Sequence, residues 1–290
     1  MRAAAAFAAF LATTAPALAQ DAQTAFDGRS LARALDDRCS LYDAPERAAL
    51  DAAWLQARGT LIRGGVDPHD LTARAAGFAR RAQPMPCDSA DAQSIALDVA
   101  AAFSNWQRVR EMDFPGSERV WFAARPYPDY PAWSLSQYPV PGDPARLFGL
   151  YHEDGERVLA LGLPSASDLS TARIVMRDIA RETELTDPSL GGLLRVSGRP
   201  DWVRHAPPAH AEAMIWASGR VVTGEQMRFV FPERAIAILG ELDPREAVRI
   251  EVLDARGRIV ETLFVEVGDF AAGAAFLAAG NGMGSGGTGG

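Results

Sequence analysis

The stretch from Cys39 to Cys87 begins CSLYDAPE (39–46), ends QPMPCDS (83–89) and holds the only two cysteines of the 290-residue chain. Apolar residues recur at helical spacing up to Cys39, which places that cysteine on the buried side of a helix, and a second such pattern starts after Cys87. A disulfide between them would join the first and the fourth helix of one module. Their wide spacing favours a structural bridge over a redox-active Cys-x-x-Cys pair.

Helical patterns fill the rest of this module. Asp43-Ala44-Pro45-Glu46 predicts a helix start, because it combines an acidic cap, a proline in the first turn and a glutamate in the capping-box position. Gly64-Gly65 ends that helix, and Asp67-Pro68 begins the next. Four helices with short connections predict an antiparallel bundle over residues 20–113.

The N-terminus is typical of a secretory signal. A positive start, Met1-Arg2, precedes an alanine-rich apolar stretch that ends Ala17-Leu18-Ala19, with small residues before a cleavage point. The alternative, a first helix of the folded protein, is disfavoured by the break at Thr13-Thr14-Ala15-Pro16. We expect residues 1–19 to be removed and the mature protein, with its cysteines oxidised, to reside in the periplasm.

The charge of the chain narrows the choice of partners. Its 29 basic residues, all arginine, face 37 acidic ones, for a formal net charge of −8. Nucleic acids and anionic membrane surfaces bind basic faces, so both are disfavoured. No later apolar run reaches the length of a membrane-spanning helix. A protein or a glycan of the cell envelope is left as the partner class, and no cofactor is indicated.

Strand patterns replace helical ones beyond Phe114-Pro115-Gly116. Residues 114–146 predict a Pro- and aromatic-rich connector with the first strands, because prolines suit edge strands or polyproline-like segments. Residues 147–279 predict an α+β domain of antiparallel strands with a closing C-terminal helix; its first hairpin turns at Asp154-Gly155. The glycine-rich tail, residues 280–290, is predicted to be disordered.

The last hairpin alternates apolar and charged residues. Its strands are Val248–Leu253 and Ile259–Val265. A period of two places the charged side chains on one face, so we expect that face of the sheet to be in water.

The C-terminal block resembles the end of invasion-associated locus B family proteins, which are secreted alphaproteobacterial β-rich proteins. The likeness rests on Phe229-Val230-Phe231, the following hairpin and a Gly-x-Phe-x-x-Gly/Ala motif, here Gly268 to Gly273. The cysteine pattern of that family is not matched, and the helical module is additional. The resemblance implies a periplasmic β-sandwich and supplies no catalytic residues.

Two sets of residues are candidates for a site. Tyr127, Tyr130 and Trp133 lie in the Pro-rich tract and would either pack along a domain seam or offer an aromatic platform to a sugar or peptide.

The second set surrounds His205 and His210. The Pro207-Pro208 pair between these histidines prevents the shared helix face that usually aims two ligands at one metal, which favours exposed loop histidines. A zinc site would need a third ligand, with Asp201 or Glu212 nearest.

A non-catalytic binding or envelope-structural protein is the function that these patterns favour. The chain has no Gly-x-Ser-x-Gly, Ser-x-x-Lys or His-Glu-x-x-His motif. Two alternatives stay open. One is a metal-assisted or acid-base hydrolase that uses the His205–Glu212 loop. The other is a periplasmic assembly factor that holds a peptide in the bundle groove or on the Tyr127–Trp133 tract.

Overall fold

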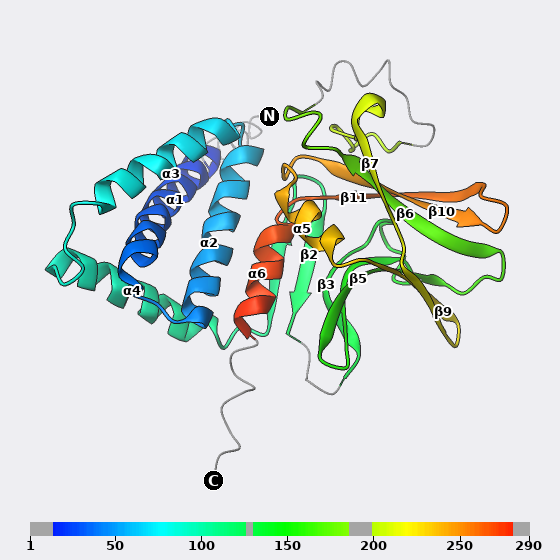
Figure 1. Cartoon of the computed structure of the whole chain (residues 1–290), viewed down its shortest axis with the longest axis horizontal. Helices are drawn as coiled ribbons and strands as arrows, with labels where there is room; N and C mark the ends of the chain where they lie inside the picture. Colours follow the sequence, from blue (N-terminus) through cyan, green and yellow to red (C-terminus); the bar gives the residue numbers. More distant parts are fainter. Residues whose placement is uncertain (1–13, 126–129, 186–198, 281–290) are drawn as a thin grey trace, which may run out of the picture. The chain divides into compact units, whose positions relative to one another are not determined.

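The computed structural model in Figure 1 describes residues 14–125, 130–185 and 199–280. The chain divides into two compact units, residues 1–105 and 106–290. Helices make up the first unit, and two antiparallel sheets with a closing C-terminal helix make up most of the second. The predicted α+β class is therefore confirmed, together with its order of elements.

The helical unit consists of α1 (Thr14–Cys39), α2 (Ala44–Arg63), α3 (Pro68–Ala82) and α4 (Ala90–Trp106). The capping box predicted for the second helix is present: the Asp43 carboxylate accepts the N–H of Glu46, and the Glu46 carboxylate accepts the N–H of Asp43. α1 continues through the residue at which signal cleavage is predicted, so residues 14–19 and the residues after Ala19 share one helix.

Two apolar clusters hold the helices together. In the first cluster Phe26 of α1 stacks on Trp54 of α2, with ring centroids 5.5 Å apart, and both α2 and α3 add buried side chains. The second cluster joins Ala32, Tyr42 and Leu50 to α4, which lies across the ends of α1 and α2 (Figure 1). Its members from α4 are Ile95, Ala96 and Val99, all partly buried.

The β-rich unit contains two antiparallel sheets. Within the described residues, one has the strand order β1-β2-β3-β4-β5-β9-β8 and the other β11-β10-β6-β7. The strands are β1 (Glu111–Pro115), β2 (Val120–Ala124), β3 (Ala132–Gln137), β4 (Leu147–Glu153), β5 (Glu156–Pro164), β6 (Leu169–Arg177), β7 (Glu212–Trp216), β8 (Gly219–Thr223), β9 (Gln226–Phe231), β10 (Ala247–Asp254) and β11 (Ile259–Glu266). Two helices complete the unit, α5 (Arg234–Glu241) and α6 (Phe270–Gly280).

The Pro-rich tract contributes an internal strand as well as a connection. β3 lies between β2 and β4, although prolines restrict a segment to sheet edges when they fall inside it. Pro131 and Pro139 stand outside the ends of β3, so its own backbone N–H groups stay available for pairing.

The charged face predicted to be in water is buried at β10. All residues of this strand are buried, including Arg249 and Glu251. The prediction was wrong because a segment from elsewhere in the chain covers this face: Trp202, Val203 and Ala206 pack against Ala247 and Phe264.

The Gly-x-Phe-x-x-Gly motif sets α6 against the seven-stranded sheet. Phe270 is fully buried, with its ring centroid 5.0 Å from that of Trp121 in β2. A Cβ atom at Gly273 would lie 2.7 Å from a methyl carbon of Leu135 in β3, so glycine permits this close approach. Gly268 has φ 48° and meets the backbone of Gly116. Both glycines thus serve the packing of the helix.

Two partly buried arginines bond carbonyls in the last turns of α6. Arg125 donates to the carbonyl of Phe276 at 3.1 Å, and Arg157 to that of Leu277 at 3.1 Å. Arg125 also donates to the carbonyls of Gln107 and Val109, just after α4. The two cations therefore satisfy backbone acceptors at the negative end of the helix dipole.

The Glu266 carboxylate connects the two sheets. It is the last residue of β11, it is buried, and it accepts three consecutive N–H groups, from Ser117 at 2.6 Å, Glu118 at 2.9 Å and Arg119 at 2.7 Å. The indole N–H of Trp121 donates to the Glu266 carbonyl at 3.0 Å. Gln137 of β3 both donates to that carbonyl and accepts the Glu266 N–H. We call these contacts the Glu266 clamp.

Removing this carboxylate should destabilise the β-rich unit strongly. Glu266→Ala removes a buried carboxylate that accepts three partly buried N–H groups, so we expect a loss of about 3 kcal/mol in the free energy of unfolding. Urea denaturation followed by tryptophan fluorescence measures it. Glu261→Ala in the same strand is the control; it removes a partly exposed ion pair with Arg146, which is worth about 1 kcal/mol or less. Equal losses would contradict the clamp.

Candidate functional site

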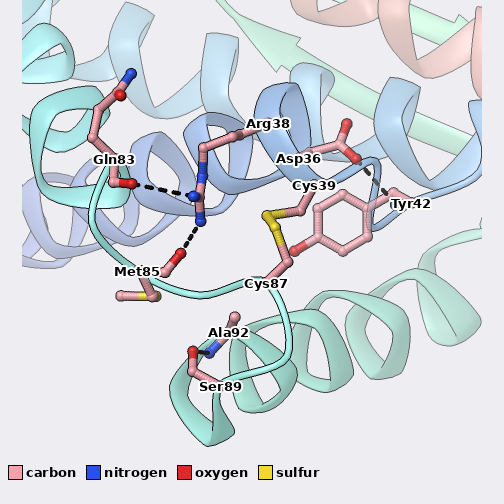
Figure 2. The surroundings of a disulfide bond; sticks show 9 residues. All are labelled: Asp36, Arg38, Cys39, Tyr42, Gln83, Met85, Cys87, Ser89 and Ala92. Carbon is pink, nitrogen blue, oxygen red and sulfur yellow. Dashed lines mark hydrogen bonds between the residues drawn. A yellow bond between two sulfur atoms is a disulfide. The ribbon is translucent and has the colours of Figure 1, made fainter.

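The predicted disulfide is present and lies where α1 ends. Cys39 and Cys87 are bonded, with Cα atoms 5.7 Å apart, an ordinary separation for a disulfide. The bond attaches the segment before α4 to the end of α1 (Figure 2). A disulfide of this kind indicates an oxidising compartment outside the cytoplasm.

Hydrogen bonds fasten the same connection. The Arg38 guanidinium donates to the carbonyls of Gln83, at 3.1 Å, and of Met85 (Figure 2). The Ser89 hydroxyl accepts the N–H of Ala92 in the first turn of α4 at 3.3 Å. The start of α4 is therefore fixed by one covalent bond and by polar contacts on both sides of it.

Asp36 and Tyr42 lie close to the disulfide and are joined by a hydrogen bond. The buried Asp36 carboxylate accepts the N–H of Tyr42 at 3.0 Å and pairs with Arg47. Burial by itself would raise the pKa of Asp36, but the hydrogen bonds from Arg47 and Tyr42 outweigh it, and the pKa lies below its ordinary value.

The Tyr42 ring is directed toward the disulfide (Figure 2). Burial, with the charges of Asp36 and Glu46, raises the pKa of Tyr42 to about 12, so the hydroxyl stays neutral. Neither the neutral Tyr42 hydroxyl nor the disulfide-bonded cysteines can act as a base or a nucleophile. We therefore interpret the Cys39–Cys87 disulfide as structural and call it the staple.

Removing the staple should lower the stability of the helical unit. Closing a loop with a sequence separation of 48 is worth up to about 4 kcal/mol in the chain-entropy model, so the Cys39→Ser, Cys87→Ser double variant should melt at a lower temperature. Circular dichroism at 222 nm measures the shift, and wild-type protein treated with a phosphine reductant is the matched control. An unchanged melting temperature would show that the bond contributes nothing.

The Asp36 ion pair should make the helical unit sensitive to acid. A carboxyl whose pKa is lowered by folding stabilises the folded state above its unfolded pKa, about 3.9, and this stabilisation is lost as the pH falls through the folded pKa. We expect Asp36→Asn to be less stable than wild type at pH 7, with a gap that narrows below about pH 4. Asp37→Asn, at the exposed neighbour, is the control. A gap that stays constant in urea titrations at pH 7 and pH 3 would contradict this role.

The histidine loop does not assemble into one cluster. His205 lies beside Glu246, and its carbonyl accepts the N–H of Ala247 at 2.9 Å. His210 is exposed, with Nε2 3.3 Å from a carboxylate oxygen of Glu182. That contact is the main reason why the pKa of Glu182 is lowered.

The other two predicted metal ligands are placed differently. Glu212 pairs with Arg249 at 3.0 Å, and Asp201 is exposed in a turn. In the part of the chain that the structure describes, no three His, Cys, Asp or Glu side chains gather as metal ligands would.

Arginine–glutamate pairs run across the outer face of the four-stranded sheet. We call them the charge ladder. Arg249 of β10 bonds Glu251 at 2.7 Å and Glu212 of β7 at 3.0 Å, and Arg173 of β6 bonds Glu251 at 2.6 Å. At one end of the sheet, Arg177 holds Glu246 through two bonds of 2.6 and 2.9 Å.

The pairing determines what these carboxylates can do. Each glutamate of the ladder has its carboxylate bonded to at least one guanidinium, so these carboxylates are engaged in structural ion pairs. Sequence reasoning missed the ladder because most of its pairs join strands that are far apart in the chain. The charged residues that share one face, Arg173 and Arg177 in β6 and Arg249 and Glu251 in β10, were the available signal.

The aromatic residues of the Pro-rich tract have different environments: Trp133 packs against the sheet, and Tyr130 is exposed to solvent. Trp133 contacts Tyr151 edge-on, with ring centroids 5.4 Å apart, and lies over Gly162, where a Cβ would approach its ring to 2.8 Å. Tyr130 is 72 % exposed. Tyr127 lies outside the described residues. The Trp133 ring thus packs against the sheet. The structure gives no support to an aromatic ligand platform formed by Trp133 and Tyr130 together.

Exposed apolar side chains occur instead on β7. Trp216 is 45 % and Met214 is 46 % exposed, and the pairing of β6 with β7 puts both on the same face as Arg173. The guanidinium carbon of Arg173 is 5.1 Å from the centroid of a Trp216 ring. We call these three side chains the β7 surface. The sequence predicted the strand but did not determine whether Trp216 faces core or solvent.

Comparison with known proteins gives no relative: no family model, no curated protein and no solved structure matches the chain. Among the helices of the described residues, none is long and apolar enough to cross a membrane.

Proposed function

We propose that the protein is a non-catalytic binding protein of the periplasm, which holds a protein or glycan of the cell envelope against the β7 surface. The observation that carries this proposal is the exposure of Trp216 and Met214 beside Arg173. Tryptophan, methionine and arginine are enriched in binding interfaces, and a flat ring with a polar rim suits both sugars and peptides.

The β7 surface is preorganised. Arg173 stays beside the tryptophan ring because its guanidinium is also bonded to Glu251 of the charge ladder. Trp216 lies on a strand paired with β6, which restricts its backbone. A partner therefore binds without ordering a loop, and this lowers the entropic cost of association.

The hydrolase alternative has less support from the geometry. Glu212, one of its candidate residues, is engaged by Arg249, and His205 and His210 have different neighbours. The assembly-factor alternative would use a groove of the bundle, but apolar side chains of α1, α2 and α3 pack against one another there.

The proposed compartment follows from the disulfide together with the signal-like N-terminus. The resemblance of the C-terminal block to invasion-associated locus B proteins agrees with a secreted β-rich protein and adds no catalytic residue.

Co-sedimentation tests this proposal. Purified protein is mixed with peptidoglycan sacculi or with outer-membrane vesicles from a Gram-negative bacterium, and the bound fraction is measured across a range of concentrations. We expect binding to one of these probes and a weakening of at least about tenfold for Trp216→Ala, as for a residue at the centre of an interface.

Val260→Ala is the matched control, since Val260 is similarly exposed but lies on β11. The proposal fails if neither probe is bound, or if Trp216→Ala and Val260→Ala bind alike. Turnover of a glycan, ester or phosphate substrate that is lost on changing His205 or His210 would favour the hydrolase instead.

A further inference from the structure

β8 is an edge strand without the usual protection. Among the described residues it ends the seven-stranded sheet and pairs only with β9, and all five of its residues are exposed. Val221 and Val222 are 40 % and 51 % exposed. Natural edge strands are commonly blunted by proline, by several charges or by a covering element. β8 has no proline and a single charge, Arg220.

The opposite edge of the same sheet is protected. β1 contains Pro115, and its Phe114 is buried against Phe276 of α6, with ring centroids 5.7 Å apart. Of the two edges of this sheet in the described residues, β8 is therefore the less protected one.

The hairpin geometry determines which backbone groups of β8 face outward. β8 and β9 are joined by the two-residue loop Gly224-Glu225, and the φ of 59° at Gly224 suits the first position of such a loop. The flanking pair, Thr223 and Gln226, is then hydrogen-bonded, and bonded pairs alternate along the ladder. Val221 therefore bonds to β9, whereas the N–H and C=O groups of Arg220 and Val222 point to the free edge.

We propose that β8 pairs with β8 of a second copy, antiparallel, about a two-fold axis that passes beside Val221. In this register Val221 lies opposite Val221 of the partner subunit, and Arg220 lies opposite Val222 of the partner subunit. The outward N–H and C=O groups of Arg220 then form hydrogen bonds with those of Val222 of the partner subunit. The result is one continuous sheet formed from the two seven-stranded sheets.

The strand itself favours a second copy as its occupant. The symmetric register brings valine against valine, and it keeps the two Arg220 side chains from lying opposite each other, which would be repulsive. Because β8 of each copy uses the same edge, the contact is isologous, so the pairing closes after two copies and does not extend into a fibre. Five residues from each copy make a small contact, so we expect a dissociation constant in the micromolar range.

Single-cysteine cross-linking tests the register. The native cysteines are bonded to each other, so one added cysteine reports only on contacts between copies. Residues opposite each other in a non-hydrogen-bonded antiparallel pair have Cα atoms about 4.5 Å apart, within the range of a disulfide. We expect Val221→Cys to form a covalent dimer under mild oxidation, as seen on a non-reducing gel.

Two controls make this test decisive. Thr223→Cys is on the same strand, but its copy in the partner subunit would be about 13 Å away along the strand, so it should not cross-link. Val260→Cys is similarly exposed on β11 and should not cross-link either. Equal cross-linking of all three variants would mean random collision and would overturn the proposal.

Sedimentation velocity gives an independent readout. Wild-type protein should shift from monomer to dimer as its concentration rises through the micromolar range, and Val221→Lys should remain monomeric with an unchanged circular dichroism spectrum. A wild-type chain that stays monomeric up to about 200 µM would overturn the pairing. The dimer does not depend on the proposed function: Trp216→Ala should leave cross-linking of Val221→Cys intact.

Discussion

The carboxylate of Glu266 is the contact on which the β-rich unit depends. It ends β11 in one sheet and accepts three consecutive N–H groups from the turn that precedes β2 in the other. A buried carboxylate is costly to leave without hydrogen-bond donors, so this one side chain fixes the offset between the sheets. The same turn contains Gly116, against which Gly268 packs, so the clamp also determines where α6 begins and which strands it covers.

The charge ladder on the outer face contributes specificity more than stability. Moving ionised side chains out of water is expensive, and their mutual attraction roughly repays that cost. A strand slipped by one residue would bury an arginine without its glutamate, however, so the pairs among Arg173, Arg249 and Glu251 favour one register of β6 and β10. The carboxylates of this face are thereby engaged in ion pairs, and Met214, Trp216, Val221 and Val222 are exposed on the neighbouring strands β7 and β8.

Local signals in the sequence predicted most of the elements. The capping box at Asp43, the Asp154-Gly155 turn and the alternation of β10 and β11 each depend on neighbouring residues, and each corresponds to an element of the structure. The cysteine pair was also predictable, because the two cysteines have no other partner. Alternation along a strand shows only that side chains share a face. Whether that face meets water depends on the segment that covers it, which for β10 includes Trp202. The exposure of Trp216 and the separation of the histidines could not be predicted from the sequence either, because both depend on how distant segments of the chain pack.

The disulfide and the Glu266 clamp differ in the sequence separation of the residues that they join. The disulfide joins residues separated by 48 positions, whereas the Glu266 clamp joins residues up to 149 positions apart. If the chain emerges from a translocation channel N-terminus first, the helices can fold and be oxidised while the strands are still arriving. The seven-stranded sheet has no such early route, since its β1–β2 turn stays unclamped until the end of β11 has been delivered. Under that condition the helical unit can be covalently complete before the β-rich unit closes, because the Glu266 clamp needs the end of β11.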